Sequence, residues 1–542
     1  MQLLINRTKQ FIFAQQTSMF SSTIIIASML IVARIFGFWR YRVLAGFFTT
    51  AELDIFFASF RWPDLIFEIL ITGALTSSFI PYFIKYEKDK KNQSINVSTI
   101  INVVILVLLA LICMLVAIMP LIMNIITPGY TEEKIRIITF YSQVLLLGQL
   151  PYLVFGNFLT GISQARKSFL LPAIAPVIYN LGIILMTYLG AGQLHMLAPI
   201  LGVVIGAFAF FLIQIPILFN SDFLYIFTIR KSKEIWEFFK VAIPRIFTVV
   251  VAQIDATIDL SLTTLLGGGS YTIFYLAQHL QLLPVSILGM AFGQASLPYL
   301  TEVYQHKHKD EFKKIIADSL LNVMFLVLPI SAYLIFARTP IVRFFYGGEK
   351  FDWESTNLTA LTLSYFALSL PFHSIYYFIT RCFYAMFDSR TPFFASFISI
   401  GINGILSLIF VLLLRLPVWS LAVAFSISIT VNVIILFIIL HFKLKFFDLR
   451  YMGEELTKML IATGISVLVN SALLRLLDGL ILDTTRTINV FFLLIITSLS
   501  FLLLYLFISW LLNVKELYLI TKMTLKFKEY QRKIIEIYTG VQ

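Results

Sequence analysis

Long apolar segments recur along the whole chain and are separated by shorter polar stretches. Windows of about twenty apolar residues, the length that an α-helix needs to cross a bilayer, occur fourteen times. The pattern predicts an all-α polytopic membrane protein with about fourteen transmembrane helices and with both termini on one side. The predicted spans cover approximately residues 17–38, 55–85, 98–127, 139–163, 168–190, 197–219, 241–266, 271–299, 318–338, 356–380, 391–414, 418–440, 456–477 and 488–512.

Basic residues are distributed unevenly between the two sets of loops. Most of the 41 lysines and arginines lie in the termini and in the even-numbered loops. Because cytoplasmic loops are rich in Lys and Arg, we expect a multi-pass protein with both termini in the cytoplasm. This bias also explains the net charge of +12, so the charge does not indicate nucleic-acid binding.

The composition and the short motifs exclude several classes of protein. With 59% hydrophobic and 13% charged residues, the chain does not resemble a soluble domain. The first apolar run lacks a cleavage site, so we interpret it as a membrane helix. The two cysteines, Cys113 and Cys382, give no disulfide framework or metal site. Motifs for phosphate-binding loops, zinc proteases or nucleophilic catalysis are absent from the sequence, which favours a transporter over an enzyme.

The chain resembles itself at a displacement of about 217–220 residues. "SSFIPY" at 77–82 returns as "QASLPY" at 294–299, and Pro172 falls opposite Pro392. A duplication of six helices predicts two lobes related by an axis along the membrane normal, with a cavity between them. The predicted parts are an N-lobe at 1–220, a cytoplasmic connector at 221–234, a C-lobe at 235–445, two extra helices at 446–514 and a basic amphipathic cytoplasmic tail at 515–542.

Arginines stand at the end of the first apolar run, in the stretch "ARIFGFWRYRVLAGFF" at 33–48. A guanidinium at bilayer depth costs at least about 2.5 kcal/mol, so each one needs a partner, a cavity or a route to the interface. Arg34 and Arg40 point about 120° apart on a straight helix, and Gly37 between them is a candidate hinge. Converging guanidiniums would bind a phosphate or pyrophosphate through their planar forks.

Charged residues at the end of, or within, the second predicted span leave a structural alternative open. They are Asp54, Arg61, Asp64 and Glu68. The three carboxylates would neutralise Arg40 or Arg61 without any substrate, and Arg42 would extend to the outer interface. We favour a role for Arg34 in lining the cavity, because it lies further inside the predicted span.

Two carboxylates in the seventh predicted span suggest ion coupling. Asp255 and Asp259 stand at i and i+4 and therefore share a helix face, where they need a cation or a shared proton. Polar residues of the eleventh and twelfth spans would complete an oxygen-lined Na⁺ site: Asn403, Ser407 and Thr430. The alternative is a structural pairing with Arg245 or His279.

Several stretches resemble the MurJ/MviN family. The opening stretch, "ELDIFFASFRWPDLIFEILITGALTSSFIPYF", "QARKSFLLPAIAPVIYN", "LPVSILGMAFGQASLPYL" and "RCFYAMFDSRTP" follow the order of the family's motifs. The resemblance implies a member of the multidrug/oligosaccharidyl-lipid/polysaccharide exporter superfamily. It also implies a flippase that moves lipid II, the undecaprenyl-pyrophosphate-linked peptidoglycan precursor, across the bacterial cytoplasmic membrane by alternating access.

The resemblance also implies roles for particular residues. Arg34, Arg40, Asp54 and Arg61 fall on charged positions of the family, and the arginines would bind the pyrophosphate. His279 follows Gln278 where the family has an Asp-Arg pair, which makes it a further candidate for substrate contact. Other departures from the family pattern are Tyr41, Asp64, Phe67 and Thr72.

Three functions follow as hypotheses. The first is a monomeric lipid II flippase that works without a cofactor, contacts only its glycolipid and membrane lipids, and is driven by Na⁺, H⁺ or the membrane potential. The second is an ion-coupled exporter of another lipid-linked oligosaccharide or a small amphiphile on the same fold. The third is a membrane scaffold without transport, which the missing arginines favour and the retained ones oppose.

Overall fold

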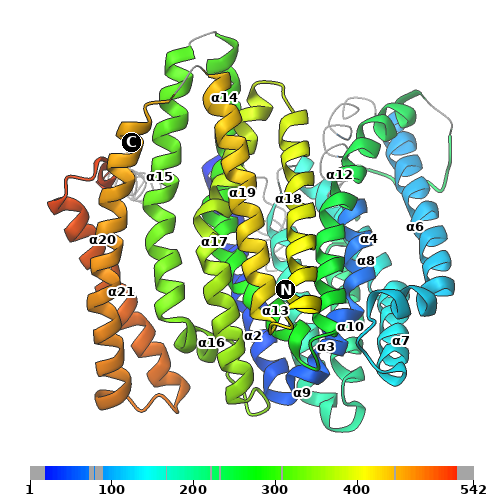
Figure 1. Ribbon diagram of the computed structural model, residues 1–542. Helices are drawn as coiled ribbons and strands as arrows, with labels where there is room; N and C mark the ends of the chain where they lie inside the picture. The colour runs from blue at the N-terminus through cyan, green and yellow to red at the C-terminus, as the bar shows by residue number, and fades with distance from the viewer. Residues whose placement is uncertain are drawn as a thin grey trace, which may run out of the picture. The chain divides into compact units, whose positions relative to one another are not determined.

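The computed structural model describes residues 19–71, 79, 83, 90–166, 168–219, 223–230, 233–306, 309–444 and 447–521 (Figure 1). All regular secondary structure within these ranges is helical, which confirms the predicted all-α class. The predicted tail lies outside the described residues beyond Thr521, and so does Thr72.

Eleven of the described helical segments are long and apolar enough to cross a membrane, and each coincides with a predicted span. They are Gln93–Ile126, Glu132–Ala165, Leu170–Leu194, Leu197–Phe219, Ser270–Gln305, Asp310–Phe336, Trp353–Ala385, Arg390–Leu413, Trp419–Lys443, Leu449–Gly479 and Thr487–Leu511. The other three predicted spans, at 17–38, 55–85 and 241–266, include residues or side chains outside the described part of the chain, so the count of fourteen stays a prediction. The helix of the first of these spans runs from Met19 to Phe47, beyond the predicted end at 38, because helicity continues through the arginines.

The chain forms two compact units, of which unit 1 comprises Met1–Thr272 and Phe345–Ser355. Its helices are α2 (Met19–Phe47), α3 (Thr50–Ser59), α4 (Arg61–Glu68), α6 (Lys90–Ile126), α7 (Glu132–Gly148), α8 (Leu150–Ala165), α9 (Leu170–Leu194), α10 (Leu197–Leu212), α11 (Pro216–Phe219) and α12 (Lys233–Thr264).

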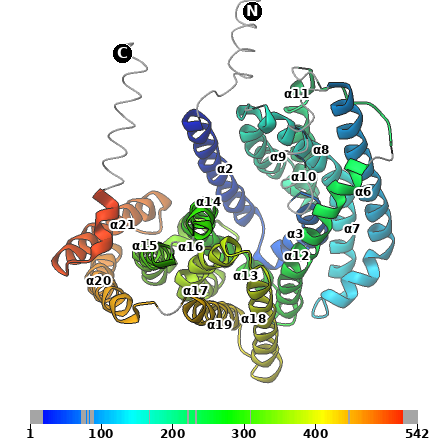
Figure 2. The ribbon, with the colours of Figure 1, turned by 90° about the horizontal axis from the view of Figure 1, so that it is seen from above.

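Glycines let two helices of unit 1 pack closely. A Cβ atom added to Gly182 on α9 would lie 2.6 Å from Cα of Gly206 on α10, and Figure 2 shows these helices side by side. Small residues at such positions let helix backbones approach each other in membrane proteins. The backbones of α9 and α10 therefore lie in close contact.

Unit 2 comprises Ile273–Phe344 and Thr356–Gln542. Its elements are α13 (Ser270–Pro284), η2 (Val285–Met290), α14 (Ala291–Gln305), α15 (Lys309–Phe336), α16 (Arg338–Tyr346), α17 (Trp353–Ala385), α18 (Arg390–Leu408), η3 (Ile409–Leu413), α19 (Trp419–Lys443), α20 (Leu449–Leu476), η4 (Leu477–Ile481), α21 (Thr487–Leu511) and η5 (Lys515–Leu517). The first turns of α13 and α17 thus belong to unit 1. The predicted lobe boundaries stay predictions.

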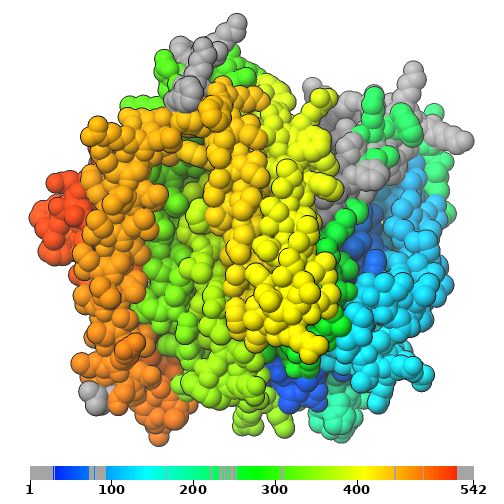
Figure 3. Space-filling model, viewed as in Figure 1, coloured from blue at the N-terminus to red at the C-terminus, as the bar shows by residue number. Residues whose placement is uncertain are grey.

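The core of unit 2 is built on α15, α17 and α19. Phe312, Phe378 and Leu436 are among its fully buried side chains. α18 packs on α19 through small polar residues, where the Ser399 hydroxyl donates to the Ser428 carbonyl at 2.9 Å. Figure 3 shows these two helices, in yellow and amber, as one continuous surface of unit 2.

Candidate functional site

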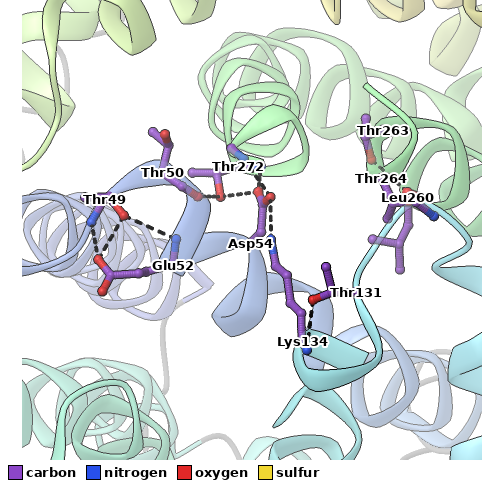
Figure 4. A network of polar contacts seen from close by, with 12 residues as sticks. Thr49, Thr50, Glu52, Asp54, Thr131, Lys134, Leu260, Thr263, Thr264 and Thr272 are labelled. Atoms are coloured by element: carbon purple, nitrogen blue, oxygen red, sulfur yellow. Dashed lines mark hydrogen bonds and ion pairs between the residues drawn. The ribbon is translucent and has the colours of Figure 1, made fainter. Parts of the chain in front are cut away.

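Asp54 lies on α3 in unit 1, fully buried, and its carboxylate is surrounded by donors (Figure 4). Oδ2 accepts from Lys134 Nζ at 3.2 Å and from Gly269 N–H at 2.7 Å, and Oδ1 accepts from Thr272 N–H at 2.9 Å. The Thr272 hydroxyl lies 2.8 Å from Oδ1 as well. Because the first N–H groups of a helix lack partners within it, this carboxylate caps the N-terminus of α13 from another helix.

The first turn of α7 positions the Lys134 side chain next to Asp54. Thr131 caps this helix by accepting the Lys134 N–H at 3.4 Å, and Lys134 Nζ lies 3.9 Å from the centre of the Tyr130 ring. Burial and the neighbouring Asp54 carboxylate raise the pKa of Tyr130, so its hydroxyl stays protonated. Asp54 and Lys134 are therefore a partly buried ion pair, with the lysine side chain 17% exposed.

The loop between α12 and α13 has the conformation that brings its N–H groups to Asp54. Gly267 and Gly269 take φ angles of +103° and +89°, which residues with a Cβ rarely adopt. A Cβ on Gly269 would also lie 2.6 Å from Thr50 Oγ1. Glycine is required here because the loop must turn tightly against the start of α3.

Residues at the junction of α2 and α3 also contact the first turn of α17. The hydroxyls of Thr50 and Ser355 lie 3.1 Å apart, and the Thr272 hydroxyl lies 2.9 Å from the Thr50 carbonyl. Gly348 lies against Gly46, since a Cβ on it would lie 2.7 Å from Gly46 Cα. One corner of unit 1 therefore anchors the beginnings of α13 and α17, both of which continue into unit 2.

Arg61 is buried and links α4 to α12. Its Nε donates to Thr257 Oγ1 at 3.0 Å, and its terminal NH₂ group donates to the Gln253 carbonyl. Both acceptors are neutral, so these bonds position the guanidinium without neutralising it. Arg61 also interacts electrostatically with Asp64 and Asp259.

Arg40 reaches the same region from α2. Its guanidinium lies 4.5 Å from the centre of the Tyr41 ring, and Asp64 is within electrostatic range of Arg61, Glu68 and Arg40. The structure therefore brings two of the three predicted arginines around one exposed carboxylate.

Arg34 lies further towards the start of α2 and is exposed. Neither a hydrogen bond nor an ion pair joins it to another residue that the structure describes. α2 continues as an α-helix through Gly37, and a Cβ there would meet nothing within 4 Å. The predicted hinge at Gly37 stays a prediction.

Asp255 and Asp259 lie on α12, where Asp259 is buried and Asp255 is half-buried. Asp259 interacts electrostatically with Asp255 and Arg61, but no hydrogen bond among the described residues reaches its carboxylate. The Arg245 side chain lies outside the described part of the chain.

The remaining predicted residues belong to unit 2. A ring nitrogen of His279 lies 2.9 Å from the Tyr275 carbonyl, and the two rings are 4.0 Å apart. Asn403 and Ser407 are buried on α18, whereas the Thr430 hydroxyl donates to the Ser426 carbonyl of its own helix at 2.7 Å. Within the described ranges no cluster of His, Cys, Asp and Glu suits a metal ion.

The analysis of the sequence missed the partners of Asp54. Lys134 stands only as a loop cation in the sequence, and Thr272 and Gly269 act partly through backbone N–H groups that leave no signal. The one available hint was the Thr-Glu-Glu-Lys start of α7, which is typical of a capped helix.

An apolar cavity of about 330 Å³ was also not predicted. It lies in unit 2 between α15 and α21, next to η2. Its lining includes Leu288, Phe325, Pro329, Tyr333, Phe501 and Tyr505. A cavity with this lining accepts hydrocarbon in preference to polar groups.

Comparison with known proteins gives consistent matches. The family model described as "Lipid II flippase MurJ" matches residues 43–477. A probable lipid II flippase MurJ of Aquifex aeolicus is 24% identical over 412 residues, which are 76% of this chain and 81% of that protein.

Solved structures agree with the sequence matches. The structure titled "Lipid II flippase MurJ, inward closed conformation" has a TM-score of 0.73 and 26% identity, and covers 90% of this chain and 98% of its own. An inward-facing multidrug resistance MATE family transporter of the MOP superfamily has a TM-score of 0.65 at 15% identity, over 78% of this chain and 98% of its own, and shows the shared fold.

Proposed function

Because the chain belongs to the MurJ lipid II flippase family, we propose that it moves lipid II from the inner to the outer leaflet of the bacterial inner membrane. The observation that carries the proposal is the match of the family model to most of the chain, together with the arginines that unit 1 assembles. The protein is a transporter of the inner membrane with multiple membrane passes, and we propose that both of its termini are cytoplasmic.

Arg34, Arg40 and Arg61 are proposed to bind the pyrophosphate of the undecaprenyl-linked substrate. Arg61 is held by neutral acceptors, and Arg40 lies in the same electrostatic group. A pyrophosphate would displace Asp64 as their counterion, since phosphate oxygens accept bidentate hydrogen bonds from guanidinium groups. Arg34, which is exposed, would be the first of the three arginines to contact the pyrophosphate.

Asp54 is proposed to position helices for transport instead of contacting the substrate. Gly269 and Thr272 donate hydrogen bonds to its carboxylate, and these bonds hold the first turn of α13. Alternating access requires that such end contacts form in one state and break in the other. His279, on the same helix, stays a candidate substrate contact.

The apolar cavity of unit 2 supports a lipid-linked substrate. Its lining is almost entirely hydrocarbon and aromatic, which suits a part of the polyprenyl chain. We propose that the protein works as a monomer and without a cofactor, and that Na⁺, H⁺ or the membrane potential drives the cycle.

A second candidate function is an ion-coupled exporter of another lipid-linked oligosaccharide or a small amphiphile. The observation that favours it is the buried Asp259 carboxylate, to which no described residue donates a hydrogen bond. Asn403, Ser407 and Thr430 stay the proposed further ligands of a coupling ion.

Complementation of a bacterium depleted of its own flippase tests the proposal. The unmodified chain should restore growth and move lipid II in vesicles. Arg40→Ala or Arg61→Ala should lower the apparent affinity about tenfold to a hundredfold, since a hydrogen bond to a charged group contributes about 1.5–3 kcal/mol.

Arg136→Ala is the matched control, because this arginine is exposed and pairs only loosely with Glu132 at 3.8 Å. It should behave like the unmodified chain. Failure of the unmodified chain to move lipid II, despite normal insertion and transport of another amphiphile, would favour the second function.

A further inference from the structure

An extended segment at 223–230 runs beside α6 on the surface of unit 1 (Figure 1, Figure 2). It joins α11 to α12 and has no helical structure in this range. The side of α6 that it follows carries Ser94, Ser98 and Asn102, which are spaced by four residues and therefore form a single polar stripe.

The polar stripe of α6 supplies hydrogen-bond partners to the backbone of the segment. The bonds are Leu224 N–H to Ser94 Oγ (3.3 Å), Ile226 N–H to Ser98 Oγ (2.9 Å), and Asn102 Nδ2 to the carbonyls of Ile226 (3.3 Å) and Thr228 (2.8 Å). Backbone groups of an irregular segment that faces lipid must be satisfied within the protein. The stripe on α6 meets this requirement along the segment.

Several apolar side chains of the segment are exposed, although the Tyr225 hydroxyl turns inward and donates a hydrogen bond to Asn102 Oδ1. Phe223 is buried against Phe83, with 6.0 Å between the ring centres, and it fixes the start of the segment. Beyond it, Leu224 is 72% and Phe227 is 86% exposed, and Tyr225, Ile226 and Ile229 are exposed as well. A run of exposed apolar side chains of this length is typical of an interaction surface.

The position of the segment along the axis of α6 indicates which surroundings its exposed side chains have. α6 rises about 36 Å between Asn102 and Ile126, and the hydrocarbon core of a bilayer is about 30 Å thick. Asn102, and Thr228 bonded to it, therefore lie at the headgroup level when the rest of α6 spans the core, whereas Leu224 beside Ser94 lies about 12 Å further out. The exposed apolar residues of α6 begin just beyond it, at Leu106 and Val107.

We propose that the end of this segment, residues 227–230, forms an interfacial membrane anchor whose exposed apolar side chains, Phe227 and Ile229, insert among the lipids of the leaflet at the N-terminal end of α6. Exposed Arg230 ends the segment and suits the phosphate groups of those lipids. The anchor fixes the depth of α6 and holds the connection to α12 against it. The inference does not depend on which substrate is transported.

Spin labelling of the full chain in nanodiscs of phosphatidylcholine and phosphatidylglycerol tests the anchor. A nitroxide at Phe227→Cys, in a background with Cys113→Ser and Cys382→Ala, should be accessible to oxygen and shielded from a soluble nickel chelate. Leu109→Cys, an exposed apolar site on α6, is the lipid control, and Arg136→Cys is the water control.

Two outcomes would overturn the anchor. Accessibility to nickel equal to that at position 136 would place the segment in water, and shielding from both reagents would indicate a protein partner or a second copy of the chain.

The polar stripe is tested by a second variant. Ser98→Ala combined with Asn102→Ala should speed amide exchange at residues 224–228 about tenfold or more, since each lost hydrogen bond contributes about 1 kcal/mol. Ser98→Thr retains the hydroxyl and should leave the exchange unchanged. Equal exchange in the double variant would mean that the stripe does not hold the segment.

Discussion

Two buried carboxylates in the described part of unit 1 have contrasting surroundings. Asp54 accepts hydrogen bonds from Lys134, Gly269 and Thr272, so its charge is matched by donors on every side. Asp259 is buried too, but Arg61, with which it interacts electrostatically, donates its hydrogen bonds within the described part of the chain to Thr257 and to a backbone carbonyl and none to Asp259. The same chemical group is therefore a fixed structural element on α3 and an incompletely satisfied one on α12.

The contrast separates a positioning residue from a candidate ion site. A buried charge without sufficient partners raises the free energy of the folded state. Such a group therefore needs a bound ligand or a proton, or it is retained for a function. A fully satisfied charge requires none of these, because its hydrogen bonds already stabilise the fold. Substitution should therefore affect the stability of the two sites in opposite directions.

Asp54→Asn should have the largest effect. The amide presents N–H groups to donors and leaves Lys134 without a counterion, which should cost about 3 kcal/mol of stability. Thermal unfolding in detergent should show a clear decrease, and complementation should be lost.

Lys134→Met serves as the partner variant for this test. In a double-mutant cycle the two substitutions should be strongly non-additive, because each removes the same ion pair. Additive effects, or an unfolding temperature of Asp54→Asn equal to that of the unmodified protein, would contradict the structural role of Asp54.

Sodium should stabilise the protein through Asp259. An ion that binds only the folded state contributes about 2.7 kcal/mol at a hundred times its dissociation constant. The unfolding temperature should therefore rise with NaCl but not with choline chloride at equal ionic strength, and Asp259→Asn should abolish this rise.

Without sodium, Asp259→Asn should unfold no earlier than the unmodified protein, because it removes a buried charge that lacks donors. Destabilisation by Asp259→Asn to the same extent as by Asp54→Asn would show that both carboxylates are structural.

The helices were predictable from the sequence because a bilayer imposes a length and a composition on each of them. The segment at 98–127, for example, contains apolar residues over a whole span and returns as Gln93–Ile126. The end of α2 was less predictable, since hydropathy falls at Arg40 although the helix continues to Phe47. Hydropathy reports the surroundings of a residue and does not determine its backbone conformation.

The site was predictable in its residue types but not in its contacts. Charge inside an apolar run identified Asp54 and Arg61, because the cost of burial is a local property. Their partners are distant in the sequence: Lys134 lies 80 positions from Asp54, and Thr257 lies 196 positions from Arg61. Such pairing follows from the packing of helices, and a single sequence does not contain it.

Thr272 provides the smallest and most selective test of the Asp54 site. Its hydroxyl lies 2.8 Å from Asp54 Oδ1 and 2.9 Å from the Thr50 carbonyl, but one proton serves only one acceptor at a time. Thr272→Val keeps the shape and the backbone N–H and should cost about 1 kcal/mol, the contribution of a single hydrogen bond. Thr272→Ser retains the hydroxyl and should unfold at nearly the original temperature. A decrease with Thr272→Ser as large as with Thr272→Val would assign the effect to the lost methyl group and its packing, and the cap of α13 would then rest on the backbone N–H groups and Lys134.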